Sequence, residues 1–298
     1  MEVIEAGSIA RAAETLHLAQ PALSAQMRQL EESLKCHLLL RSSKGVVPTA
    51  AGIELVKRGR EVLRAFDTLQ MIGRDMAATP SGPVTIGLPA SVGSMVSVPL
   101  VEAVLKRYPN IELSLLESTS ADLGVQLAQG RLDIAVLFEG NVVGTMPHEA
   151  VLEEDLFVVG VACDRENFEL AALHGLPLVM PARPNSIRII LDKACALNAI
   201  APRIVAEISS PHSMLKLTRA GIGATVLPGS MLDEKKYAPL TAARIISPSL
   251  SRTICLAGNS SVPDAPRITA VRNLLRETLE KLVLDSRWSG TRLKTIKT

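Results

Sequence analysis

Apolar positions follow two different rhythms along the chain, and the rhythm changes near residue 80. Before that point apolar residues recur three and four positions apart, which is typical of amphipathic helices. After it, short apolar runs alternate with helical stretches, and this alternation predicts a doubly wound, largely parallel sheet. We expect strands at 84–88, 111–117 and 134–138, and helices at 96–107, 121–129 and 266–284.

Two short helices joined by a tight turn are expected near the start. Ser8 is suited to cap the first helix, which runs to about Leu16, and residues 17–19 have the length of a helix-turn-helix connection. Pro21 fits the first turn of the second helix because its missing N–H would have no partner there. The inward face of this second helix is expected to carry Leu23, Met27, Leu30 and Leu34.

Polar groups align on another face of the second helix. Gln20, Ser24 and Arg28 recur every fourth residue, so an amide, a hydroxyl and a guanidinium group point the same way. Such a face has the chemistry to contact base edges and phosphates in a DNA major groove, and an ordinary surface helix is the alternative. A basic cluster follows, in which a single acid, Glu54, stands among Lys35, Arg41, Lys44, Lys57, Arg58 and Arg60.

These features resemble a known family in their order and spacing. The run GSIARAAETLHLAQPALSAQMRQLEESL, followed by LLLRSSKGVVPTAAG, is similar to the winged helix-turn-helix of the LysR-type transcriptional regulators. Within that family, the second run and the later run EEDLFVVG are similar to regulators of nitrogen assimilation control. The family positions that the chain shares are Gly7-Ser8, Ala12-Ala13, Leu16, Gln20 to Ser24, Leu30-Glu31, Arg41, and Thr49 with Gly52.

The resemblance implies a transcriptional regulator that binds double-stranded DNA as a homodimer or homotetramer, without a cofactor and with RNA polymerase as a further partner. Two positions depart from the family, since Ala25 stands where an arginine is frequent and Ala19 where a capping serine is common. Residues 1–6 are expected to supply only the last turn of the family's first helix. The DNA-binding residues that the resemblance implies are Ser8, Gln20, Pro21, Ser24, Arg28, Arg41 and Thr49, of which Gln20, Ser24 and Arg28 face the major groove while Arg41 and Thr49 hold the DNA backbone.

A long helix is expected from residue 50 to about 76, with Thr49 as its cap. It carries an apolar stripe at sevenfold spacing, and an exposed helix with such a stripe needs a partner. In the family the corresponding helix pairs with its twin, so the resemblance implies that it forms the dimer. The alternative is a helix packed on its own domain. The stripe consists of Leu55, Val62, Leu69 and Met76.

The chain is expected to be α+β overall, with an N-terminal all-α winged helix-turn-helix and a long linker helix. The resemblance then implies two α/β lobes of the periplasmic-binding-protein type. An internal echo, LAQGRLDIAVL at 127–137 and LTRAGIGATVL at 217–227, supports two similar lobes. We expect the DNA-binding domain at 1–49, the linker helix at 50–78, a hinge at 79–83, lobe 1 at 84–159 with 260–285, lobe 2 at 160–259, crossings near 159–160 and 258–259, and a disordered basic tail at 286–298.

A cleft between the lobes would collect the loops that follow the strands, where ligands of open α/β sheets bind. Their hydroxyl and N–H groups favour a small anionic or dipolar effector, and Arg183 or Arg188 is placed to pair with its carboxylate. The alternatives are that these residues are only helix caps, and that the regulator acts without an effector at a level set by its own concentration. The expected effector-binding residues are Ser91, Ser118, Thr119, Ser186 and Ser210.

Composition narrows the remaining classes. With 47% hydrophobic and 21% charged residues and no signal peptide, the chain is expected to be a cytoplasmic protein that does not enter the membrane. A solute-binding protein of the same two-lobe fold is the runner-up, but it would have no use for the first 76 residues. The five histidines are scattered and no catalytic or metal-binding motif accompanies them, so we expect neither an enzyme nor a metal site. A redox sensor would depend on Cys163, Cys195 or Cys255.

Overall fold

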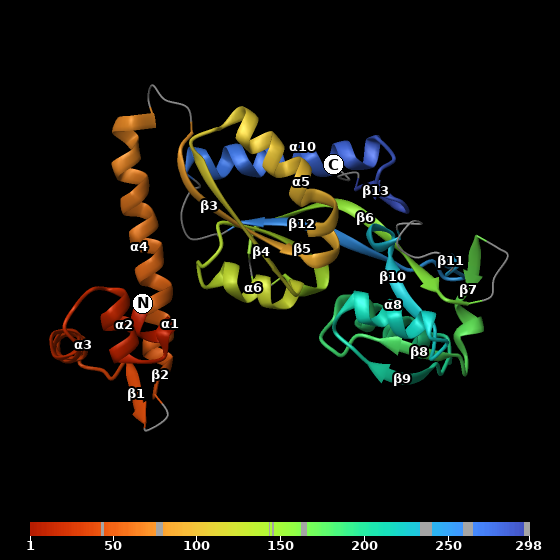
Figure 1. Cartoon of the computed structure of the whole chain (residues 1–298), viewed down its shortest axis with the longest axis horizontal. Helices are drawn as coiled ribbons and strands as arrows, with labels where there is room; N and C mark the ends of the chain where they lie inside the picture. Colours follow the sequence, from red (N-terminus) through yellow and green to blue (C-terminus); the bar gives the residue numbers. More distant parts are fainter. Residues whose placement is uncertain are drawn as a thin grey trace. The chain divides into compact units, whose positions relative to one another are not determined.

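The structure is a computed structural model that describes residues 1–42, 45–75, 80–142, 144, 146–161, 166–232, 240–258 and 265–294. Within the long helix 50–75, side chains are described at 50–60, 62, 63 and 66. The chain divides into two compact units, Met1–Arg74 and Asp75–Thr298, and each is described by itself (Figure 1).

The first unit is a small helical domain with a β-hairpin wing. Its core is formed by Val3, by Ile9 with its neighbouring alanines, and by Leu23, Leu38 and Leu39. The wing is antiparallel and pairs Leu39 with Pro48. The elements are α1 (Glu2–Ala6), α2 (Ile9–Thr15), α3 (Gln20–Leu34), β1 (Leu39–Ser42), β2 (Gly45–Pro48) and α4 (Ala50–Asp75).

The helix-turn-helix has the caps that the sequence predicts. The side chain of Ser8 accepts a hydrogen bond from the backbone N–H of Arg11, and Pro21 lies in the first turn of α3. The predicted inward stripe of α3 is wrong in its second half, because Leu30 and Leu34 are exposed while Leu23 is buried. The reason is length: α2 has seven residues and α3 has fifteen, so α2 covers only about half of α3.

Lobe 1 of the second unit is a sheet covered by helices on both faces. Strands β3 (Gly82–Pro89), β4 (Ile111–Ser118) and β5 (Ile134–Phe138) are parallel, as predicted. The sheet continues through β12 (Ser251–Gly258) and β6 (His148–Val159), which are antiparallel to their neighbours. Figure 1 shows α5 (Ala90–Arg107) and α10 (Pro266–Leu284) on one face and α6 (Ser120–Ala128) on the other.

Two expected boundaries in lobe 1 differ from the structure. The helix expected at 96–107 begins six residues earlier, because Val92 as well as Val96 packs into the core. The expected hinge 79–83 overlaps the first strand, since Gly82 and Pro83 pair with β4. The last helix, 266–284, has the predicted bounds.

Lobe 2 has its own apolar core around Leu156, Leu178, Leu191 and Val226. The echo between 127–137 and 217–227 corresponds to a helix end followed by a strand in each lobe. Short 3-10 helices among the described residues are η1 (Glu139–Asn141), which follows β5 of lobe 1, and η2 (Leu170–Leu173) and η3 (Gly229–Met231). The main elements of lobe 2 are β7 (Asn167–Glu169), β8 (Pro177–Met180), α7 (Ser186–Leu197), β9 (Arg203–Glu207), α8 (Pro211–Arg219), β10 (Thr225–Pro228) and β11 (Ala242–Ile246).

The crossings between the lobes lie earlier in the chain than expected. Strand β6 pairs with β12 up to Asp155 and with β10 from Leu156 onward. Its outward crossing is therefore at 155–156 rather than 159–160. The return lies between Leu250, in the core of lobe 2, and Ser251, in β12, rather than at 258–259. Strand β6 runs through both lobes. The expected boundary lies after the end of this strand, whereas the lobes meet inside it.

The C-terminal segment differs most from expectation. Residues 286–294 are ordered, with Trp288 buried in the core of lobe 1 and β13 (Thr291–Leu293) paired with β6. Residues 295–298 of the expected disordered tail lie outside the described residues. Four basic residues suggest a solvated tail, but the tryptophan between them has a large apolar surface to bury.

Candidate functional site

The polar face of α3 is accessible in the first unit. Gln20, Pro21 and Arg28 are exposed and Ser24 is half-buried. Arg41 reaches this face from β1, where its Nη1 lies 3.4 Å from the Ser24 hydroxyl oxygen. That distance is long for a hydrogen bond, so both groups remain available to other partners. Four of the seven predicted DNA-binding residues therefore share α3, and a fifth meets it from the wing.

The other two predicted contacts, Ser8 and Thr49, act as helix caps. Ser8 caps α2. The Thr49 hydroxyl donates to the carbonyl oxygen of His37 at 2.7 Å and accepts from the N–H of Gly52 at 3.0 Å. A hydroxyl has a single proton to donate, so Thr49 has none left for a phosphate.

The basic cluster is less positive in the fold than in the sequence. Arg58 pairs with Glu54 at 2.9 Å, and Arg60 pairs with Glu5 of α1. Lys35 and Arg41 are exposed, whereas Lys44 lies outside the described residues. The positive charge near α3 thus comes mainly from the helix end and the wing.

The predicted stripe on α4 is partly visible. Leu55 packs against the core of the first unit, whereas Val62 is 67% exposed. Leu63 and Phe66 are also exposed, at 49% and 54%. The side chain of Leu69 and the whole of Met76 lie outside the described residues.

A cavity of about 490 Å³ lies between the lobes of the second unit. Helices α5, α6, α7 and α8 all begin at its wall. The first turn of a helix has backbone N–H groups without helical partners and carries the positive end of the helix dipole. Their convergence makes the cavity suited to an anionic or dipolar molecule. It is lined by residues of the loops expected after the strands, at 89–91, 118–120, 138, 181–186 and 209. The other lining residues are Glu117, Ala121, Asn141, Ile187, Pro211, Met214, Leu227, Pro228, Met231 and Arg252.

The predicted effector-binding hydroxyl groups have different roles. Ser118 donates to a carboxylate oxygen of Asp122 at 2.6 Å, and Thr119 caps α6. Ser210 caps α8 and is not among the residues lining the cavity. Ser186 lines the cavity, and its hydroxyl oxygen is buried in the wall without a hydrogen-bond partner among the described residues. Because an unpaired buried hydroxyl costs free energy, Ser186 is suited to bind an occupant.

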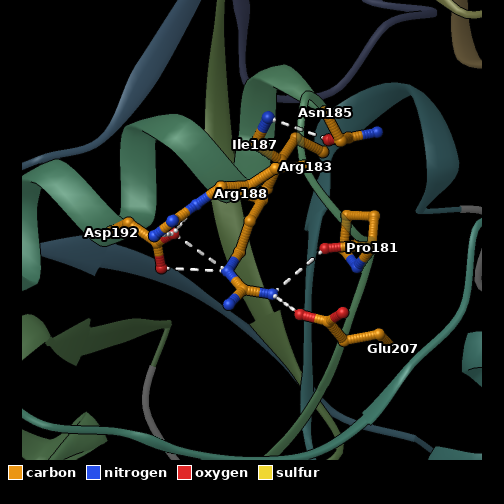
Figure 2. A network of polar contacts seen from close by, with 7 residues as sticks. All are labelled: Pro181, Arg183, Asn185, Ile187, Arg188, Asp192 and Glu207. Atoms are coloured by element: carbon orange, nitrogen blue, oxygen red, sulfur yellow. Dashed lines mark hydrogen bonds and ion pairs between the residues drawn. The ribbon is translucent and has the colours of Figure 1, made fainter.

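The two arginines expected to meet a carboxylate are both held by acids of the chain itself (Figure 2). Arg188 binds Asp192 through its Nε at 2.9 Å and Glu207 through its Nη1 at 2.6 Å. Arg183 also binds Asp192, at 2.9 Å from its Nε. Arg183 lines the cavity and is 68% exposed, whereas Arg188 does not line it. Arg188 therefore fixes the cavity wall, and Arg183 is the one placed to reach an occupant.

Sequence reasoning missed the charged pair at the cavity, Arg252 with Glu154. Arg252 is 5% exposed, its Nε donates to Glu154 at 2.8 Å, and its Nη2 donates to the Ser91 hydroxyl at 2.9 Å. The guanidinium carbon lies 3.8 Å from the ring centre of Phe138. Removing one partner of such a buried pair costs about 3–5 kcal/mol. The available signal was a charged residue two positions before an apolar run in each strand, since Arg252 precedes ICLA and Glu154 precedes LFVV.

The structure argues against redox chemistry at two of the cysteines. Cys195 and Cys255 are buried, and burial raises the pKa of Cys195 and raises that of Cys255 to about 11. Both thiols therefore stay protonated near neutral pH and react slowly. Cys163 lies outside the described residues. In the part of the chain that the structure describes, no cluster of three metal-ligating side chains and no helix able to cross a membrane is found.

Known proteins resemble this chain over nearly its whole length. The chain is 33% identical over 290 residues to the nitrogen assimilation regulatory protein nac of Escherichia coli (strain K12), covering 96% of this chain and 95% of that protein. A full-length variant of OxyR from Pseudomonas aeruginosa has a TM-score of 0.77 at 22% identity, covering 99% of this chain and 96% of that one. CbnR in complex with its target DNA has a TM-score of 0.57 at 23% identity, covering 93% and 96%.

Two family models match in sequence. The model for the bacterial regulatory helix-turn-helix protein, lysR family, matches residues 1–53, and the model for the LysR substrate binding domain matches residues 77–280. The first match contains α3 and the wing, and the second contains most of both lobes and the cavity. The chain therefore belongs to the LysR family of bacterial helix-turn-helix transcriptional regulators.

Proposed function

We propose that this regulator binds a specific double-stranded DNA site as a homodimer or homotetramer, with α3 in the major groove. We infer that Gln20, Ser24 and Arg28 contact base edges or phosphates, and that Arg41 contacts the DNA backbone from the wing. The exposed polar face of α3, with Arg41 beside it, is the observation that carries this proposal. Residues 1–49 would bind DNA, residues 50–78 would link and dimerise, and the two lobes would regulate.

A small anionic or dipolar effector in the interlobe cavity is the second part of the proposal. The four converging helix ends and the unpaired hydroxyl of Ser186 support it. Thr119 and Arg183 are further contacts from opposite lobes. Such a regulator carries out no catalytic step and acts on the chromosome in the cytoplasm.

An effector-independent regulator, controlled by its own concentration, is the second candidate. One observation favours it: Arg183 and Arg252, which both line the cavity, are already paired with carboxylates of the chain. An anionic effector would have to share or displace those partners. The similar protein nac is named as a nitrogen assimilation regulatory protein, and this likeness supports our inference that the target genes of this regulator serve nitrogen assimilation.

The DNA-binding part is tested by Ser24→Leu. The bulky apolar side chain would block the groove-facing surface and leave polar groups of the DNA unpaired, so operator affinity should fall by about a hundredfold at fixed salt. The operator is first identified by genome-wide footprinting of wild-type protein. Binding is then measured by fluorescence anisotropy of labelled operator DNA.

Ser33→Leu is the matched control. Ser33 is an exposed serine of the same helix, and its position nine residues on is about half a turn away at roughly 100° per residue. Its affinity should stay within about threefold of wild type, since single exposed substitutions have small effects. Equal operator affinities for the two variants would contradict the placement of α3 in the major groove.

A further inference from the structure

The C-terminal segment 286–294, here called the strap, lies across the place where β6 passes between the lobes. Trp288 is 2% exposed and belongs to the core of lobe 1. On the lobe 2 side, a Cβ at Gly229 would lie 1.9 Å from the carbonyl oxygen of Ser289. Gly290 has φ +63°, and a Cβ there would lie 2.7 Å from the ring of Phe157. The strap therefore packs closely against both lobes.

Main-chain hydrogen bonds attach the strap along β6. Strand β13 pairs antiparallel with it, with Thr291 opposite Glu154 and Leu293 opposite Leu152. The N–H of Asp155 donates to the carbonyl oxygen of Gly290 at 2.8 Å. This bond lies at the crossing itself, where β6 leaves β12 and joins β10.

Ion pairs strengthen the attachment at the same point. Arg292 of the strap binds Glu153 at 2.7 Å and Asp155 at 2.8 Å. Asp155 also pairs with Arg244 of β11, at 3.0 Å. One buried carboxylate thus connects the strap to lobe 2.

Glu154 connects the strap to the cavity. It is fully buried, and its Oε1 accepts from the indole N–H of Trp288 and from the backbone N–H of Ser230 in lobe 2, each at 2.8 Å. Its Oε2 accepts from Arg252, which lines the cavity and also binds Ser91 of lobe 1. The strap, both lobes and the cavity wall meet at this carboxylate.

We propose that the strap is a clamp that fixes the angle between the lobes, and that Glu154 couples it to the cavity through Arg252. The coupling rests on the proposed function, because it takes the cavity as the site of control. A cavity occupant that moves Arg252 shifts Glu154 and so changes the hydrogen bond that Glu154 accepts from Trp288. Loosening the strap changes the position of Arg252 in return, since coupling between two sites is reciprocal.

Hydrogen exchange of the full-length protein tests the clamp. Trp288→Phe keeps a buried aromatic ring but removes the indole N–H group that donates a hydrogen bond to Glu154. The amide of Asp155 should exchange about tenfold faster, because loss of a hydrogen bond to a buried carboxylate weakens this local structure. Amides of β3, in the centre of lobe 1, should keep their wild-type rates. Equal acceleration in β3 and β6 would mean general destabilisation and would overturn the clamp.

A second variant keeps the test decisive if Trp288→Phe does not fold. Arg292→Ala removes both ion pairs from a side chain that is 49% exposed, and it should speed exchange at Asp155 severalfold. Arg287→Ala is the matched control, an exposed arginine of the strap for which the described residues provide no side-chain partner. Identical exchange at Asp155 in these two variants would contradict the proposal.

Tryptophan fluorescence tests the coupling, because Trp288 is the single tryptophan of the chain. Arg252→Lys replaces the two-pronged contact with Glu154 by a point charge and should shift the emission of Trp288. Arg183→Lys, also at the cavity but paired with Asp192, should leave the emission unchanged. An unchanged emission spectrum for Arg252→Lys would contradict the proposed coupling between the strap and the cavity. Failure of wild-type protein to bind any operator would instead reject the proposed function, whatever these measurements show.

Discussion

The carboxylate of Glu31 connects helix α3 to the β-hairpin wing. Its Oε1 accepts from the backbone N–H of Leu38 at 2.7 Å and of Leu39 at 3.2 Å. The hydrogen bond from Leu38 is the main reason why the pKa of Glu31 lies below its ordinary value, and partial burial opposes it. The ionised form is therefore favoured in the folded state, which positions β1 and Arg41 beside α3.

Glu31→Gln should lower the free energy of unfolding of the N-terminal unit by about 1 kcal/mol at pH 7. Because the folded-state pKa is lowered, the wild-type advantage is present above the unfolded pKa and is lost as the pH falls through the folded value. The difference between the two proteins should begin to shrink as the pH falls below about 4.3, the ordinary pKa of a glutamate. Urea unfolding of the full chain, followed by the methyl NMR signals of Leu39 at pH 7 and pH 4, measures this. Glu32→Gln, an exposed neighbour, serves as the control, and an equal loss in both variants would contradict the role of Glu31.

At the scale of elements, α4 combines a packed beginning with an exposed apolar continuation. Leu55 packs against the core of the first unit, whereas Val62 and Phe66 are exposed one turn apart. A helix with such a surface is expected to bury it against another helix. The start of α4 thus packs on its own domain, as one alternative for the stripe predicts, while pairing with a twin through the exposed middle of the helix stays a prediction.

Val62→Glu combined with Phe66→Glu should convert the dimer to monomers. Four introduced charges in a dimer would have to be desolvated or to repel one another across the interface. Operator affinity should also fall, because a monomer binds only one of the two half-sites of the operator. Light scattering of the full chain measures the mass. Arg58→Ala, which removes the exposed ion pair with Glu54, should remain dimeric. A double variant that is still a dimer would place the interface elsewhere.

At the scale of the whole molecule, the cavity and the DNA-binding surface belong to separate compact units. A ligand controls DNA binding only if it binds two arrangements of the lobes with different affinity. In a dimer, a change between the lobes would reach the DNA as a change in the spacing of the two half-sites.

Calorimetry of the full-length protein against amino acids, carboxylates and nitrogen or sulfur metabolites separates the two candidate modes of regulation. An effector should give a saturable heat that Ser186→Ala weakens by about fivefold to tenfold, as expected for one hydrogen bond. Ser33→Ala, on α3, should bind it as wild type does. Background heats for the whole panel, with operator affinity unaffected by each compound, would favour the effector-independent regulator.

The sequence by itself determined the helix-turn-helix, the strand and helix alternation, and the loops that line the cavity. These features depend on neighbours along the chain. Ser8 and Pro21 act within one helical turn, β5 is a continuous apolar run, and burial alternates along most of β4. The loops at 89–91 and 118–120 meet because β3 and β4 are parallel and their carboxyl ends share one edge. The loop at 181–186 follows β8, which pairs with β9 in a separate sheet of lobe 2, so the fold of both lobes brings it to the same cavity.

Only the tertiary structure decided which charges are available and where the lobes join. The sequence predicts Arg188 as a ligand-binding residue, but in the fold its guanidinium group is bound to Asp192 and Glu207. Glu154 and Arg252 are 98 residues apart, and Trp288 is 134 residues from Glu154. Periodicity describes the surroundings of a residue within a few turns of chain, whereas a buried charge is balanced by whichever group the fold brings to it. That is why a basic tail in the sequence is, in the folded protein, a segment packed across both lobes.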